Sequence, residues 1–123
     1  MASILRVDTI TDSSSNNSVA TSLVFNGVLK QWCNIKGTSS TEILDSYNTT
    51  SVTDDATGKT TVTIASDMGN DDYAITTSAQ ENTCVHAHTS VTTGSYQTQS
   101  RGSDDQAFTD VTNFGCHVAG DLA

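Results

Sequence analysis

The segment VLKQWCNIKGTSSTEILDSYNTTSVTDDATGKTTVTI, residues 28–64, decides the fold of this chain. It holds the single tryptophan, Trp32, and three runs of strand-forming residues: Val28–Lys36, Glu42–Thr50 and Lys59–Ala65. Short polar loops join these runs, and Gly58 occupies a place in the last loop that suits a tight turn with a positive φ angle. The segment therefore predicts an antiparallel meander.

Further runs of strand-forming residues occupy the C-terminal half: Tyr73–Ala79, Thr83–Thr93, Tyr96–Ser100, Ala107–Val111 and Phe114–Ala119. Polar turns separate them at intervals of about 8–12 residues, which is typical of sandwiches. The fold class predicted is all-β, an antiparallel β-sandwich that is jelly-roll-like.

The content of large apolar residues is low. Hydrophobic residues make up 35% of the 123 residues and aromatic residues 6%. So few large apolar side chains cannot fill the core between two wide sheets within one chain. The chain is either a thin, partly polar sandwich or a protomer that completes its core in an oligomer, and we favour the oligomer.

The charge balance excludes several partners. Fourteen acidic residues against five Lys and Arg give a formal net charge of −9, and the basic residues are scattered. Such a surface repels nucleic acid and anionic membranes, so no nucleic-acid binding is expected. We see no signal peptide and no apolar run long enough for membrane insertion. Three cysteines, an odd number, fit a reducing compartment, and synthesis in a cytoplasm is expected.

Residues 1–27 are interpreted as an extended N-terminal arm, and residues 28–123 as the sandwich domain. In the arm, apolar residues alternate with polar loops, and we assign an assembly or anchoring role to Ile4, Leu5, Val7, Ile10, Val19, Leu23 and Phe25. The alternative is that residues 1–27 supply the first strands of the sandwich.

One constellation could bind metal. Cys84, His86 and His88 alternate along a predicted strand, so their side chains share one face, and Zn²⁺ accepts both residue types. The spacing matches no established zinc motif, and a buried cysteine with packed histidines is the favoured alternative. Cys116 and His117 could lie alongside, but they point to opposite faces of a strand. No cofactor is expected.

The sequence carries no enzyme motif that we recognise, so a non-enzymatic role is predicted. Trp32 and Phe114 are predicted to lie in the core. Tyr96, in a polar stretch beside a turn, is the adhesion candidate, together with the loop residues Asp71 and Asp104.

Several segments resemble a module found in tail-fibre and other virion proteins of marine tailed phages. The family pattern of a KAWVNFNG strand, an SFNVSSITDNGTGDYTVNF hairpin and an MPDANYAV strand is similar to three segments here: Lys30–Gly37, Ser46–Ile64 and Met68–Ile75. The first residues, Ser3–Ile10, resemble an LKVDTI segment, and Val118–Ala123 resembles an HGDLA ending. Gly69 stands where the family has proline, so the bend there is expected to differ.

The resemblance implies a virion surface protein that forms a homotrimer. We favour a capsid-decoration or head-fibre protein that binds other virion proteins, such as the major capsid protein or tail proteins. The alternative is a short tail-fibre or adhesin component that binds a glycan or protein on the host surface. A metal-binding module or enzyme that uses Cys84, His86 and His88 is a further alternative. The resemblance carries no activity onto particular residues.

Overall fold

The computed structural model describes residues 3–4, 6–14, 18–80, 83–104 and 106–123, and for residues 83–88 the backbone alone. The chain is mostly β, with 56% of residues in strands and 6% in helix, and the sheets are antiparallel. The predicted all-β class is confirmed at this level. Among the described residues, no helix has the length and apolar character needed to cross a membrane.

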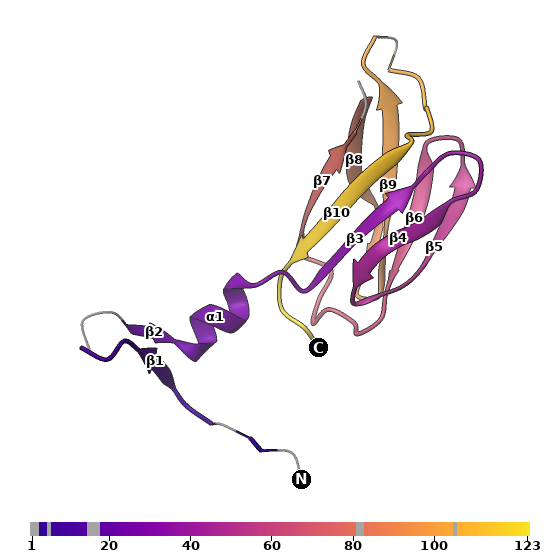
Figure 1. Cartoon of the computed structure of the whole chain (residues 1–123). Helices are drawn as coiled ribbons and strands as arrows, with labels where there is room; N and C mark the ends of the chain where they lie inside the picture. Colours follow the sequence, from indigo (N-terminus) through magenta and orange to yellow (C-terminus); the bar gives the residue numbers. More distant parts are fainter. Residues whose placement is uncertain (1–2, 5, 15–17, 81–82, 105) are drawn as a thin grey trace.

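Two four-stranded sheets form the main body, called here the two-sheet domain (Figure 1). The first sheet has the order β4-β3-β10-β7, with bounds Glu42–Tyr47, Gln31–Lys36, Asn113–Ala119 and Ala74–Ala79. The second has the order β5-β6-β9-β8, with bounds Thr49–Ala56, Lys59–Ile64, Ser95–Gly102 and Thr83–Thr92. The chain crosses between the sheets four times, so each sheet joins distant segments.

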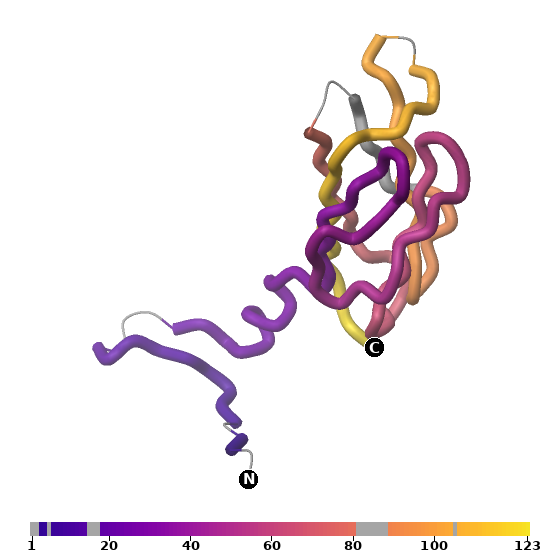
Figure 2. Tube along the Cα trace, turned by 45° about the vertical axis from the view of Figure 1, so that its right-hand side comes forward, coloured from indigo at the N-terminus to yellow at the C-terminus, as the bar shows by residue number. Residues whose placement is uncertain are grey.

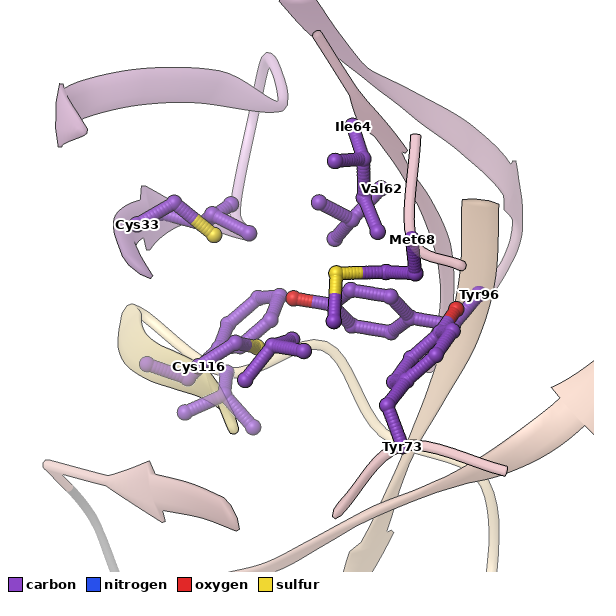
Figure 3. Packing of buried hydrophobic residues seen from close by; sticks show 11 residues of the cluster. Cys33, Val62, Ile64, Met68, Tyr73, Tyr96 and Cys116 are labelled. Atoms are coloured by element: carbon purple, nitrogen blue, oxygen red, sulfur yellow. The ribbon is translucent and has the colours of Figure 1, made fainter. Parts of the chain in front are cut away.

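The core follows from strict alternation along the central strands. Every second residue of β3, β6 and β10 is buried, because successive side chains of a strand point to opposite faces. The buried apolar residues of the two sheets and of the loops that join them form one cluster, shown in Figure 3: Cys33, Ile35, Val62, Ile64, Met68, Tyr73, Tyr96, Val111, Phe114, Cys116 and Val118. The prediction that Phe114 lies in the core is confirmed.

The predicted meander over residues 28–65 is wrong in one respect. The run Glu42–Thr50 contains the whole of β4 and the start of β5, which belong to different sheets. Asn48 makes the corner with φ 55°, and its amide group donates to the carbonyl of Lys30 (2.9 Å) and accepts from the amide of Ser66 (2.7 Å). Asparagine tolerates this left-handed conformation better than most residues. The predicted positive φ at Gly58 is confirmed, at 66°.

The N-terminal arm lies apart from the two sheets (Figure 2). It contains a small antiparallel ribbon, β1 (Thr9–Thr11) with β2 (Ser18–Ala20), followed by α1 (Thr21–Gly27). None of the residues of α1 is buried. Lys30 joins the arm to the domain, because its Nζ donates to the carbonyl of Phe25 and its backbone amide to that of Val118.

Candidate functional site

The outer face of the first sheet carries an ordered row of side chains. Trp32 on β3 lies opposite Tyr47 on β4 and opposite His117 on β10, which in turn pairs with Thr76 on β7. The neighbours of these residues along each central strand, such as Cys33 and Cys116, point into the core. Four strands therefore present one continuous face that is chemically distinct from the core.

A groove of about 410 Å³ lies on this face and spans β3, β10 and β7. Its outward-facing walls are formed by Trp32, Asn34, Ser78, Gln80, Asn113 and His117. We call these residues, with Gly115 beneath them, the outer groove. Its lining combines an aromatic ring, amides, a hydroxyl and an imidazole, and it contains no carboxylate, ammonium or guanidinium group.

Gly115 keeps the middle of the outer groove low. A Cβ atom added there would lie 3.1 Å from the Oγ of Ser78, so any side chain would occupy the space between the strands. At one end, Asn113 Nδ2 donates to Gln80 Oε1 at 2.6 Å, and the backbone amide of Gln80 donates to the carbonyl of Asn113 at 3.0 Å. These bonds fix the two amide side chains that form the rim.

A polar network supports the sheet from below. The Tyr96 hydroxyl reaches across from β9 and donates to Gln31 Oε1 at 2.9 Å, and Gln31 Nε2 donates to Thr49 Oγ1 at 2.8 Å. Figure 3 shows the hydroxyl of Tyr96 directed toward Cys33 and Cys116. The hydrogen bond between the two thiols raises the pKa of Cys116, and burial raises it further. The network joins the two sheets at their centre.

Tyr96 is therefore not an adhesion residue, and that prediction is wrong. Its side chain is 0% exposed, and burial raises the pKa of its hydroxyl. The Ser, Thr and Gln residues around it alternate: Thr98 and Ser100 face inward with Tyr96, and Gln97 and Gln99 face the other way. A polar neighbourhood in sequence thus surrounds a residue at the centre of the core.

Asp71 and Asp104 lie in exposed loops, but at opposite ends of the two-sheet domain. Asp71 precedes β7, whose first residue pairs with the last residue of β10. Asp104 follows β9, which ends beside the first residue of β8. The three adhesion candidates consequently form no common surface.

Most of the described apolar side chains to which an assembly role was assigned are exposed to solvent. Ile4 is 77% exposed, Leu23 65% and Phe25 66%; Val7 and Ile10 are also exposed and Val19 is half-buried. Leu5 lies outside the described residues. Arg6, Asp8 and Thr21 join the apolar side chains around a second hollow of about 550 Å³. The assembly role of these residues stays a prediction.

The predicted metal-binding side chains are not among those that the structure describes. The side chains of Cys84, His86 and His88 lie outside the described residues, although β8 places Cys84 opposite Arg101 and His86 opposite Gln99. Among the side chains that are described, no three Cys, His, Asp or Glu residues gather as a metal site. Cys116 is buried and His117 exposed, which confirms that they point to opposite faces.

The prediction that Trp32 lies in the core is wrong, and Trp32 was therefore not identified from the sequence as a residue of the outer face. Trp32 is half-buried and faces outward, between the fully inward Gln31 and Cys33. The alternation of Cys33 and Ile35 was the available signal: if these residues face inward, Trp32 and Asn34 must face outward. Comparisons with protein-family models, curated proteins and solved structures found no match for this chain.

The buried tyrosines predict loss of stability at alkaline pH. Tyr73 donates to the carbonyls of Thr92 (2.8 Å) and Ser95 (3.0 Å), and burial, with a contribution from the Asp71 carboxylate, raises its pKa from 10.0 to about 12. The folded state therefore holds this proton more tightly than the unfolded state. The stabilisation is complete below pH 10 and is lost as the pH rises from 10 toward 12.

Urea unfolding at a series of pH values checks this expectation. Tyr73→Phe removes one titrating group, so its free energy of unfolding should fall less steeply over the same interval. A wild-type free energy that stays constant between pH 10 and pH 12 would contradict the assignment.

Proposed function

We propose that this chain is a non-enzymatic surface protein of a tailed-phage virion. In this proposal the N-terminal arm attaches copies of the chain to one another and to the particle, and the two-sheet domain is displayed outward. The observation that carries the proposal is the distribution of apolar surface. The two-sheet domain has its own core, whereas α1 buries none of its residues.

The N-terminal arm exposes apolar side chains whose burial against a partner would be favourable. Leu23 and Phe25 are exposed on α1, and Ile10 is exposed on the ribbon beside it. Full burial of each such side chain stabilises an assembly by about 1.5–3 kcal/mol. A helix this short is marginal in water without packing, so contact with a partner would also stabilise α1 itself.

The same proposal extends to the fold and the oligomeric state of the protein. We propose a jelly-roll-like β-sandwich that works as a homotrimer, and the sandwich is supported by the eight strands in two four-stranded sheets. Other virion proteins, either the major capsid protein or tail proteins, are the further partners. The net charge of −9 fits a surface that avoids packaged nucleic acid.

Replacing the apolar side chains of α1 is expected to abolish self-association. Wild-type protein should elute with a light-scattering mass three times that of the 12.9 kDa chain, and a Leu23→Ser/Phe25→Ser variant with the mass of one chain. Leu44→Ser is the matched control, because Leu44 is 48% exposed but lies on β4 in the two-sheet domain. A wild-type protein that is monomeric at micromolar concentration would contradict the trimer.

Electron microscopy of purified particles with a gold-labelled antibody against this chain tests where the protein lies on the virion. Label over the head supports the capsid-decoration or head-fibre type that we favour. Label confined to the tail supports the short tail-fibre or adhesin alternative. Particles without label would contradict the virion assignment.

A further inference from the structure

We propose that the outer groove binds a neutral oligosaccharide. The proposal goes beyond the assembly role of the arm and does not depend on it, because the groove lies entirely on β3, β7 and β10 and the turns that end them. It rests on three features: an outward-facing aromatic platform, a fixed set of uncharged hydrogen-bonding groups, and a preformed hollow on a paired sheet.

The aromatic platform consists of Trp32, which lines the groove, and Tyr47 on β4, which extends the aromatic surface beyond its edge. They are cross-strand partners on the outer face, and Tyr47 is 56% exposed. One face of a pyranose ring is lined by C–H groups, and such a face packs against an aromatic ring with both dispersion and weak polar attraction. A half-buried Trp beside an exposed Tyr leaves aromatic surface in water, and a sugar face covers it without requiring charge.

The walls supply donors and acceptors that match hydroxyl groups. Asn34, Asn113 and Gln80 present amides, Ser78 a hydroxyl and His117 an imidazole, so both donation and acceptance are available. The bond from Asn113 to Gln80 reduces the freedom of the rim before any ligand arrives. Preorganised groups lose less entropy on binding, which favours a small polar ligand.

The absence of charge in the lining decides the class of saccharide. The walls of the outer groove contain no ammonium or guanidinium group, and the chain has a net charge of −9. Lys36, the cross-strand partner of Asn113 at the rim, is already paired with Glu42 Oε1 at 3.1 Å. A sulfated or carboxylated sugar would have to compete with that carboxylate and would approach a chain of net negative charge. The groove therefore suits uncharged hexose units.

The shape also fits a chain of sugars. The groove crosses three strands, and Gly115 holds its floor open where any side chain would fill it. The sheet beneath is held by paired strands and by the Tyr96–Gln31–Thr49 network. Ligand sites are usually preformed hollows of this kind with a few placed polar groups.

The intrinsic fluorescence of Trp32 provides the assay, since the chain has one Trp. Purified full-length protein is titrated with short neutral oligosaccharides of glucose, galactose, mannose and N-acetylglucosamine. At least one of them should give a saturable blue shift or quench of the emission. His117→Ala should weaken that binding about tenfold, the equivalent of about 1.4 kcal/mol.

Two further variants separate the groove from the rest of the molecule. Gly115→Val should abolish binding by filling the floor, with retained folding checked by circular dichroism. Gln99→Ala, on the outer face of the second sheet, removes an amide of the same kind far from the groove and should bind like wild type. The Leu23→Ser/Phe25→Ser variant should also bind, so the site can hold even where the assembly proposal fails.

Several results would overturn the proposal. No saturable change with any of these saccharides would do so, as would binding that His117→Ala and Gly115→Val both leave intact. An emission shift that follows protein concentration instead of saccharide concentration would show that this face is a contact between copies of the chain. Tighter binding of a sulfated saccharide than of its neutral parent would contradict the argument from charge.

Discussion

Replacing Tyr96 with alanine is expected to lower the free energy of unfolding by about 3–5 kcal/mol. The ring is 0% exposed, contacts the Tyr73 ring edge-on with centroids 6.3 Å apart, and lies at the centre of the core in Figure 3. Alanine would leave a cavity between two sheets whose backbones are fixed by pairing on both sides. Urea unfolding followed by circular dichroism measures the loss.

One further variant separates the ring of Tyr96 from its hydroxyl group, and a second, at Tyr47, is the control. Tyr96→Phe keeps the ring but leaves Gln31 Oε1 without its donor inside the core, at a cost of about 1–3 kcal/mol. Tyr47→Ala removes an exposed tyrosine of the first sheet and should change stability by about 0.5 kcal/mol or less. A cost below about 1 kcal/mol for Tyr96→Ala would show that the core closes over the cavity.

The alternation of the strands was readable from the sequence. Val62 and Ile64, and likewise Cys33 and Ile35, are spaced by two, and this spacing alone predicts strands with one buried face. Gly58 after a run of turn-forming residues predicted the tight turn between β5 and β6, which the structure has. Both features are local, so no knowledge of distant segments is needed.

The positions of Trp32 and Tyr96 were not readable from their side chains. The larger aromatic was assigned to the core and the tyrosine among Ser, Thr and Gln to the surface, and the structure reverses both. Polar residues can be buried here because they are hydrogen-bonded: Thr98 Oγ1, for example, donates to the carbonyl of Thr60 at 3.1 Å. The low apolar content of the sequence therefore understates the size of the core.

The outer groove could not be predicted from the sequence because it depends on strand order. Trp32, Ser78 and His117 are far apart in the chain, and they meet because β10 lies between β3 and β7. A register shifted by one residue would turn His117 inward and Cys116 outward. Long-range pairing of this kind is set by the packing of the whole domain.

Gly58→Ala is expected to lower the free energy of unfolding by more than about 2 kcal/mol, from two independent costs. The φ angle of 66° is left-handed, which costs a residue with a Cβ about 1–2 kcal/mol. The added Cβ would also lie 2.6 Å from the carbonyl oxygen of Ser100 and 2.8 Å from the amide nitrogen of Thr109. Both are backbone atoms, so neither can rotate away.

The steric clash of an added Cβ at residue 58 would also disturb the hydrogen bonds around the turn. The Gly58 amide donates to Asp110 Oδ1 at 2.7 Å, and its carbonyl accepts from the amide of Ser100 at 2.8 Å, so a shift of the turn would strain the end of β9. Gly69→Ala is the matched control, because its nearest contact would be an ordinary 3.5 Å to the carbonyl oxygen of Asp121. Its effect should stay within about 1 kcal/mol in either direction. Equal losses for the two variants in urea unfolding would show that general removal of glycine, and not the geometry at Gly58, causes the effect.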